Sequence, residues 1–424
     1  MPTRLRAERL DPESQALLRY LNLAQGRSAT RVPDVRQMRR RWKLAALAFG
    51  RRTPVAAVEH RRIEGPAGPL RVRIYRPAAR GAPGKLPVFL FFHGGGFVMG
   101  GVGTADSICR AIAERSGAVV VTAQYRLAPE HGLHAGRDDS LTVYDWIVRE
   151  ADALGIDASR TAFGGDSAGG NLAAVLAQRI AQRGKSSGRD NGVIHAMRLQ
   201  VLVYPATNLR DTLASKAENA EGYLLTAANI EWFETQFAAG LDTADPLVSP
   251  ALAQDLRGLP PALVVSAGFD PIRDDGLAYA DLLRAAGVPV QLLHYGGQFH
   301  GFVNFDAVLH GARDALDRIG DALATAFAGE RAPDRTIEIG TGGRTGPALL
   351  GGALRDAMVG SLMLAEWTEH ARNTLAASMM PTAARGWLAY PVWNVASQWR
   401  SMWVSALAPL EARQTHGPMG RETQ

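Results

Sequence analysis

The chain has 424 residues, of which 46% are hydrophobic and 21% are charged with the two signs mixed. This excludes a disordered chain and predicts a folded protein with a sizeable core. The single cysteine, Cys109, excludes an intramolecular disulfide and a metal site built of cysteines. No run of about 18 uninterrupted apolar residues occurs, so no membrane-spanning helix is predicted. The charged N-terminus lacks the apolar segment of a secretory signal, and we expect a cytoplasmic protein.

The net charge of +6 has a local source in the basic run at 36–43 and in the pair Arg51 and Arg52. Such a run could attract nucleic acid or an anionic membrane, or it could form the solvated face of a helix. No nucleic-acid-binding motif accompanies it. We therefore favour the solvated face and expect no nucleic-acid partner.

In chain order, residues 1–50 have leucine and alanine at helical spacing, and residues 55–76 alternate like two strands around a turn at 65–68. Short apolar runs then alternate with helical stretches. The apolar runs predict strands at 86–92, 118–123, 160–163, 199–204, 262–266 and 288–294, the last of which is expected to close the series. This alternation predicts an α/β fold with a mostly parallel central sheet and helices on both faces.

Three regions depart from the alternation. Residues 208–250 contain helix-like pieces and are predicted to be an insertion over the carboxyl edge of the sheet. Residues 331–347 are rich in glycine and predict a linker. Residues 348–424 contain five of the eight tryptophans and predict an extension of one or two amphipathic helices. Within it, Val395, Trp399, Trp403 and Leu407 recur every four residues and would share one helical face.

The segment Gly165-Asp-Ser-Ala-Gly169 follows a predicted strand and precedes a predicted helix, which is the setting of a nucleophile elbow. Side chains two positions either side of the serine would collide with neighbouring backbone in so sharp a turn, and glycine removes those collisions. Ser167 is therefore the predicted nucleophile.

The segment His93-Gly-Gly-Gly-Phe97 lies at the end of the strand predicted at 86–92. Consecutive glycines leave backbone N–H groups bare, and such groups stabilise the oxyanion that forms during acyl transfer. We assign the donors to Gly95, Gly96 and Ala168. His93 is expected to anchor the glycine loop by hydrogen bonds rather than to act as a base.

In this fold the catalytic acid and then the histidine follow the serine in the chain. The histidines that qualify are His195, His294, His300, His310 and His416. We favour His300 because it follows a strand, whereas His294 lies inside that strand and is expected to be packed in the core.

The favoured acid is Asp270, the first acidic residue in the loop that follows the strand at 262–266, where it would fix the imidazole tautomer. Asp274 and Asp275 lie where the next helix begins and are expected to cap it. Asp166 and Glu130 are expected to hold loops by hydrogen bonds.

Together these motifs resemble the hormone-sensitive-lipase-like (bacterial family IV) esterases of the α/β-hydrolase superfamily. The resemblance covers residues 55–325 and rests on His93-Gly-Gly-Gly, Tyr125-Arg-Leu-Ala-Pro-Glu130, Gly165-Asp-Ser-Ala-Gly-Gly170, Asp270-Pro-Ile-Arg-Asp-Asp275 and His300-Gly-Phe302. It implies a serine carboxylesterase that hydrolyses short- to medium-chain esters through an acyl-enzyme, with no cofactor and no metal. It also implies a catalytic domain at 51–330, with a cap formed by residues 1–50 and 208–250.

The chain departs from the family pattern after Glu130, where His131-Gly-Leu-His-Ala-Gly-Arg-Asp-Asp139 lacks the usual prolines, and residues 331–424 have no counterpart. Two alternatives to a soluble esterase stay open. One is a small-molecule-binding protein of this fold that hydrolyses nothing. The other is a lipase attached by residues 348–424 to a membrane, a lipid granule or a second copy of the chain.

Overall fold

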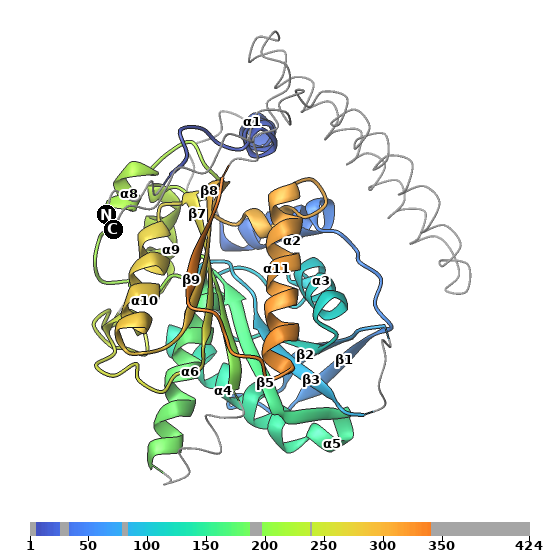
Figure 1. The fold of residues 1–424 in the computed structure, drawn as a ribbon. Coiled ribbons are helices and arrows are strands. Elements are labelled where there is room, and N and C mark those ends of the chain that lie inside the picture. Colours follow the sequence, from blue (N-terminus) through green and yellow to red (C-terminus); the bar gives the residue numbers. More distant parts are fainter. Residues whose placement is uncertain (1–5, 26–33, 79–83, 187–196, 238–239, 341–424) are drawn as a thin grey trace, which may run out of the picture.

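A nine-stranded sheet forms the centre of the described part of the chain (Figure 1). The computed structural model describes residues 6–340, except 26–33, 79–83, 187–196 and 238–239. The strand order is β1-β2-β4-β3-β5-β6-β7-β8-β9. The hairpin β1 (Ala57–Ile63) and β2 (Leu70–Arg76) is antiparallel, and β2 pairs antiparallel with β4 (Val119–Ala123). All other neighbouring strands are parallel, as the alternation of strands and helices predicts.

The central strands β3 and β4 are mostly apolar because both faces of the sheet are covered by helices. In β3 (Leu86–Phe92), Val88, Leu90 and Phe92 join one core cluster, whereas Phe89 and Phe91 join the other. The first cluster includes residues of α4 (Leu133–Arg149), α6 (Ala168–Ser186) and α10 (Arg273–Ala285). The second includes residues of α3 (Asp106–Ser116) and α11 (His310–Phe327). The short helix α5 (Ala151–Leu154) leads into β5 (Ile156–Asp166).

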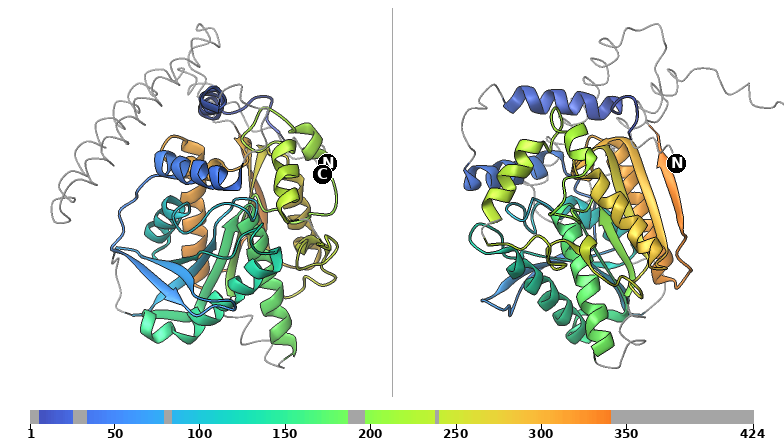
Figure 2. Two further views of the ribbon diagram at one scale, coloured as in Figure 1. Left: turned by 180° about the vertical axis from the view of Figure 1, so that it is seen from behind. Right: turned by 90° about the vertical axis from the view of Figure 1, so that its left-hand side faces the viewer.

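Helices from the two predicted cap regions lie across one end of the sheet (Figure 2). Residues before the sheet form α1 (Pro12–Gln25) and α2 (Val35–Phe49). Between β6 (Met197–Val203) and β7 (Ala262–Phe269), the chain forms α8 (Ala214–Glu218), α9 (Ala227–Phe237) and the short 3₁₀ turn η1 (Pro250–Leu252). Side chains of α2 and α9 pack on Val98 and Met99, just beyond the glycine loop at residue 93. The cap is therefore in contact with the loops that follow the strands.

The end of the sheet differs from the sequence prediction. The predicted linker at 331–347 contains a strand, β9 (Arg335–Ile339), which pairs parallel with β8 (Val290–Phe299). The strand series therefore closes at β9 and not at 288–294. Three of the five residues of β9 are exposed at the edge of the sheet, so it lacks the apolar run that marks the buried strands. Residues 341–347 and the helices predicted in 348–424 lie outside the described residues.

Within those described residues, no helix is long and apolar enough to cross a bilayer.

Candidate active site

Ser167 occupies a sharp turn between β5 and α6. Its φ of 57° is in the left-handed region, which is strained for a residue with a side chain. A Cβ on Gly165 would collide with the backbone of Gly169, and one on Gly169 would collide with the carbonyl of Phe92. Both glycines are therefore needed for the turn. The backbone N–H of Ser167 donates to the carbonyl of Val203 at 2.8 Å, which ties the turn to the neighbouring strand.

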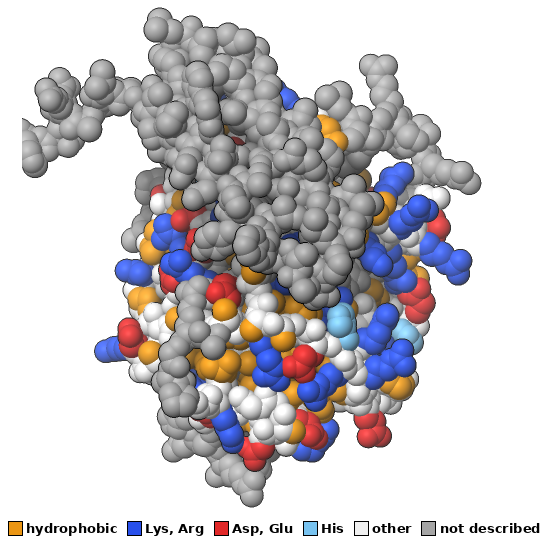
Figure 3. All heavy atoms as spheres, turned by 90° about the vertical axis from the view of Figure 1, so that its right-hand side faces the viewer, with side chains coloured by type: hydrophobic (Ala, Val, Ile, Leu, Met, Phe, Trp, Pro, Cys, Tyr) orange, Lys and Arg blue, Asp and Glu red, His pale blue; other side chains and the backbone are white. Residues whose placement is uncertain are grey.

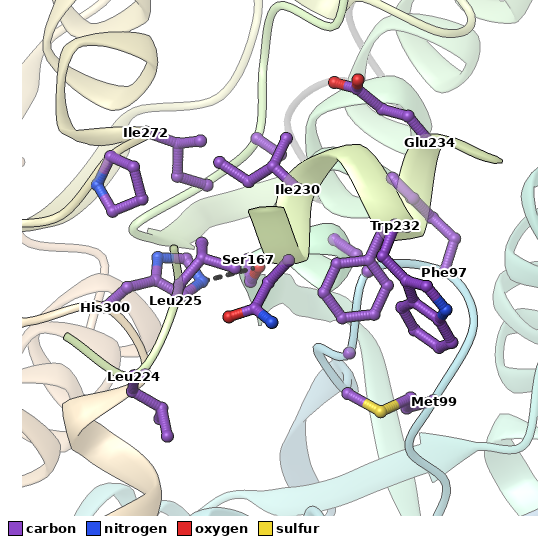
Figure 4. Close-up of a pocket in the computed structure, with 18 of the residues that line it drawn as sticks. Phe97, Met99, Ser167, Leu224, Leu225, Ile230, Trp232, Glu234, Ile272 and His300 are labelled. Atoms are coloured by element: carbon purple, nitrogen blue, oxygen red, sulfur yellow. Dashed lines mark hydrogen bonds between the residues drawn. The ribbon is translucent and has the colours of Figure 1, made fainter. Parts of the chain in front are cut away.

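A chain of two hydrogen bonds joins Ser167, His300 and Asp270. His300 Nε2 lies 2.9 Å from Ser167 Oγ, and His300 Nδ1 lies 2.8 Å from Asp270 Oδ2 (Figure 4). Asp270 follows the last residue of β7 and His300 follows the last residue of β8. The strands β7 and β8 run parallel to β5, which leads into Ser167, and all three belong to one sheet. Their carboxyl ends therefore bring the three side chains to one edge of the sheet.

The carboxylate of Asp270 is held in place by its own turn. The side chain is fully buried, and Oδ1 accepts a hydrogen bond from the backbone N–H of Ile272 at 2.8 Å. The other oxygen, Oδ2, remains available to bond the imidazole of His300. This geometry fixes the ring so that Nδ1 carries the proton and Nε2 can accept one from the serine.

Asp274 and Asp275 do not cap α10, contrary to the expectation from sequence. The helix begins at Arg273, so both residues lie inside its first turn, and its N-cap is Ile272. They bind the cap instead. Asp274 accepts from the N–H of Ser215 at 2.8 Å, and Asp275 accepts from the N–H of Asn208 at 3.3 Å. Burial raises the pKa of Asp275 to about 8.

Two glycines of the loop that follows β3 lie beside the same cavity as Ser167. Gly95 and Gly96 have φ values of 123° and 58°, which favour glycine, and both line the same cavity as Ser167 and Ala168. The N–H groups of Gly95, Gly96 and Ala168 engage in no hydrogen bond within the described part of the chain. That of Gly94 is already used, because it donates to Asp166 Oδ1 at 2.7 Å.

His93 is part of the support of this loop. Its ring stacks on Tyr125 with 4.3 Å between centroids, and its Nδ1 lies 2.9 Å from the carbonyl of Gly94. The Tyr125 hydroxyl donates to the carbonyl of His93 at 2.7 Å. Burial lowers the pKa of His93 to about 4, so its ring is neutral at physiological pH.

The other candidate histidines lie elsewhere. His294 is buried in β8, with Nδ1 2.8 Å from Ser266 Oγ. His310 pairs with Glu13 at 2.7 Å on the exposed start of α11. His195 and His416 lie outside the described residues. No group of three or more His, Cys, Asp or Glu side chains in the described ranges is arranged to hold a metal ion.

Ser167 opens into a cavity of about 740 Å³. Most of its lining is apolar and comes from the cap, as the side chains of Leu224, Leu225, Ile230 and Trp232 in Figure 4 illustrate. Met38 and Trp42 of α2 complete it on the other side. Phe233 packs directly on the glycine loop, since a Cβ on Gly96 would lie 2.5 Å from its ring. The cavity size is in the range of small-molecule sites, which are commonly about 300–1,000 Å³.

Sequence reasoning missed Asn304 and Tyr204. Asn304 Nδ2 donates to Asp166 Oδ2 at 3.3 Å and to the carbonyl of Gly301 at 3.2 Å. The Tyr204 ring lies 4.7 Å from the His300 ring. Neither residue stands in a motif with chemistry of its own. The only signal for Tyr204 is its position directly after β6, and the only signal for Asn304 is its position four residues after His300.

The sheet and the Ser–His–Asp arrangement at its carboxyl edge define an α/β hydrolase. A family model described as the α/β hydrolase fold matches residues 89–304. Esterase LipI of Mycobacterium tuberculosis is 42% identical over 258 residues, which are 60% of this chain and 78% of that protein. The ethyl acetate hydrolase of Pseudomonas putida is 38% identical over 255 residues, with 60% and 78% covered.

Solved structures of esterases have the same fold as this chain. The Pyrobaculum calidifontis esterase is 38% identical with a TM-score of 0.66, covering 74% of this chain and 98% of that one. The ester hydrolase EH1AB1 from the metagenome of Lake Arreo, complexed with a bipyridine phosphonate derivative, is 38% identical. Its TM-score is 0.69, with 75% and 99% of the two chains covered. The chain belongs to the hormone-sensitive-lipase-like, bacterial family IV esterases and is a carboxylic ester hydrolase.

Proposed function

We propose that Ser167 is the nucleophile of this carboxylesterase, with His300 as general base, Asp270 as the acid that orients it, and Gly95, Gly96 and Ala168 as the oxyanion hole. The observation that carries the proposal is the pair of hydrogen bonds at 2.9 and 2.8 Å from serine to histidine to aspartate. The buried Ser266–His294 pair has a similar distance of 2.8 Å but does not line the cavity into which Ser167 opens, so it serves as an internal comparison.

In the acylation step, His300 Nε2 takes the proton from Ser167 Oγ as that oxygen attacks the ester carbonyl. The carbonyl oxygen gains negative charge and is stabilised by the free N–H groups of Gly95, Gly96 and Ala168. Asp270 stabilises the imidazolium that forms. His300 then gives its proton to the departing alcohol, which leaves an acyl group on Ser167.

In the deacylation step, water takes the place of the alcohol. His300 removes a proton from the water, whose oxygen attacks the acyl carbon, and the proton then returns to Ser167 Oγ as the acid leaves. The neutral His93 is buried, with its ring stacked on Tyr125 and its Nδ1 bonded to Gly94, so it supplies no proton in this scheme.

The substrate class that we propose is esters with short to medium acyl chains. A mostly apolar cavity of about 740 Å³ accommodates such a chain and an alcohol, with Ser167 and His300 in its lining. The proposed partner is therefore a small ester, bound between the cap and the carboxyl edge of the sheet.

The test compares Ser167→Ala, His300→Ala and Ser266→Ala in the full chain with a series of p-nitrophenyl esters. The first two variants are expected to lose roughly 10⁶-fold in kcat, whereas Ser266→Ala keeps most of its activity. A phosphonate inhibitor should label Ser167 alone, as mapped by mass spectrometry. Near-normal turnover by Ser167→Ala would show the assignment to be wrong. Saturable ester binding without turnover by the unaltered protein would instead favour a binding function.

A further inference from the structure

The outward face of the cap helix α2 carries two exposed leucines among cations. Leu44 and Leu47 are 55% and 58% exposed, which places them among the few large hydrophobic side chains that the described residues leave open to solvent. Arg36, Arg40 and Lys43 are also exposed. Each of these five residues lies three or four positions from another of the set, so they share one face of the helix, here called the outer face of α2.

The charge of this face is not neutralised by its neighbours. The helix contains five cations and no acidic residue. Arg39, which lies outside the outer face of α2, does have a neutralising partner, because it pairs with Glu130 at 2.7 Å. Within the described part of the chain, the side chains of Arg36, Arg40 and Lys43 form no ion pair or hydrogen bond. Lys and Arg side chains gather along the right-hand side of the face shown in Figure 3.

The opposite face of α2 is committed to the catalytic body. Met38, Trp42 and Ala45 line the cavity above Ser167, and Phe49 is buried in the core. The helix therefore has one side that forms the wall of the ester-binding cavity and one side that is cationic and apolar. Leu44 and Leu47 lie about one turn apart among these cations, so the outer face of α2 combines exposed apolar surface with positive charge.

We propose that the outer face of α2 is a docking surface for an anionic lipid surface. The three cations match negatively charged headgroups, and the two leucines can enter the boundary between headgroups and acyl chains, which is the pattern of helices that lie in a membrane interface. Docking there would hold the cap, and with it the cavity, beside a source of apolar esters. This inference does not depend on the residue roles proposed above.

The experiment uses the full chain and vesicles of phosphatidylcholine with and without phosphatidylglycerol, and it measures the fraction of protein that sediments with them. The unaltered protein is expected to bind the anionic vesicles in preference to the neutral ones, less so at high salt. Each basic residue near such a surface is worth about fivefold in partitioning. Arg36→Glu/Arg40→Glu is therefore expected to lower binding by at least about 30-fold.

Leu44→Ser/Leu47→Ser tests the apolar part, with an expected loss of about tenfold. The matched control is Arg62→Glu/Arg71→Glu, which makes the same charge change at paired, exposed positions of the β1–β2 hairpin and should bind like the unaltered protein. Turnover of a water-soluble ester should be unchanged in all three variants, since none of these residues lines the cavity.

Three outcomes would overturn the proposal. The first is sedimentation of the unaltered protein that does not depend on phosphatidylglycerol. The second is equal binding by the α2 charge variant and the hairpin control. The third is loss of binding with the charge variant but not with the leucine variant, which would assign the face to a soluble polyanion.

Discussion

The carboxylate of Asp166 and the backbone N–H of Gly94 are joined by a hydrogen bond of 2.7 Å, although 72 residues separate them in the chain. Asp166 directly precedes Ser167, and Gly94 directly precedes the two glycines proposed as oxyanion donors. The other carboxylate oxygen accepts from Asn304, four residues beyond His300. One buried side chain thus connects the nucleophile turn, the glycine loop and the segment after the histidine. Burial raises its pKa, and the hydrogen bonds from Asn304 and Gly94 oppose that rise.

Asp166→Ala should therefore lower kcat with little change in KM. Without the Asp166 carboxylate, the N–H of Gly94 loses the hydrogen bond that positions the glycine loop relative to Ser167. Misplacing one oxyanion donor lowers kcat by about 10²-fold. Asp166→Asn keeps an acceptor oxygen for Gly94 and is expected to be intermediate. A trifluoromethyl ketone, which forms an oxyanion on the enzyme, should lose affinity in parallel with kcat. If affinity for the ketone stayed constant while kcat fell, Asp166 would not act through the oxyanion loop.

Arg39 is expected to set the position of the cap. Its Nε donates to the carbonyl of Val98 at 2.7 Å and one Nη donates to that of Ala128 at 2.8 Å, while both Nη groups reach Glu130. Arg39→Ala leaves these carbonyls without their charged donor, and such bonds are worth about 1.5–3 kcal/mol each. We expect a higher KM, a smaller change in kcat, and faster cleavage of α2 by trypsin.

The control for the Arg39 prediction is Arg149→Ala, because Arg149 pairs with Glu150 on an exposed surface far along the chain from α2. Exposed pairs of this kind contribute about 0–1 kcal/mol, so this variant should resemble the unaltered protein. Identical trypsin cleavage of α2 in the two variants would contradict the role of Arg39 as a clamp.

Phe233 is expected to limit the length of the ester. Its ring covers Gly96 and lines the cavity, so Phe233→Ala opens space beside the proposed oxyanion hole. Each additional buried methylene is worth about 0.8 kcal/mol, or roughly fourfold in kcat/KM. The optimum in a series from p-nitrophenyl acetate to decanoate should therefore move toward longer chains. Thr235→Ala, on the exposed side of α9, provides the control. An equal loss at every chain length would instead indicate damage to the site.

Asp275 is expected to make stability depend on pH. Its pKa is raised by burial to about 8, from an ordinary value of 3.8. Between these values the folded protein holds a proton that the unfolded chain has released, so the free energy of unfolding falls as the pH rises from about 4 to about 8. Asp275→Asn removes this dependence because the amide is neutral throughout.

Urea unfolding at pH 5 and pH 8 tests this expectation. The Asp275→Asn variant should gain stability relative to the unaltered protein at pH 8 and gain little at pH 5. Asp281→Asn, on the exposed side of the same helix, should show no such difference between the two pH values. A gain of equal size at both pH values would mean that the charge of Asp275 is not responsible.

The fold and the three candidate catalytic side chains could be predicted because their signals are local. The glycines around Ser167 are required by the close backbone contacts of a single turn. Asp270 and His300 each follow a strand that can be recognised from its own residues. In contrast, the bonds of Asp274 to Ser215 and of Arg39 to Val98 join segments that are distant in the chain. Nothing in the neighbouring residues indicates such partners.

The strand β9 escaped prediction for a different reason. Its five residues are partly exposed at the edge of the sheet, and the pairing with β8, rather than hydrophobic burial, defines it. Residues of this kind resemble a loop when they are read without their partner strand. The same holds for Leu44 and Leu47, whose exposure depends on which side of α2 faces the body.

The separation between the sheet and the cap has an evolutionary consequence. The reacting side chains are carried by segments anchored to rigid strands, whereas most of the residues that line the cavity come from the segments before the sheet and between β6 and β7. Mutations in those cap segments can alter which ester is accepted without moving the atoms that break it. Selection on diet or habitat can therefore reshape the preferences of such an enzyme in small steps, and a laboratory library confined to α2 and α9 should retain a high proportion of active clones.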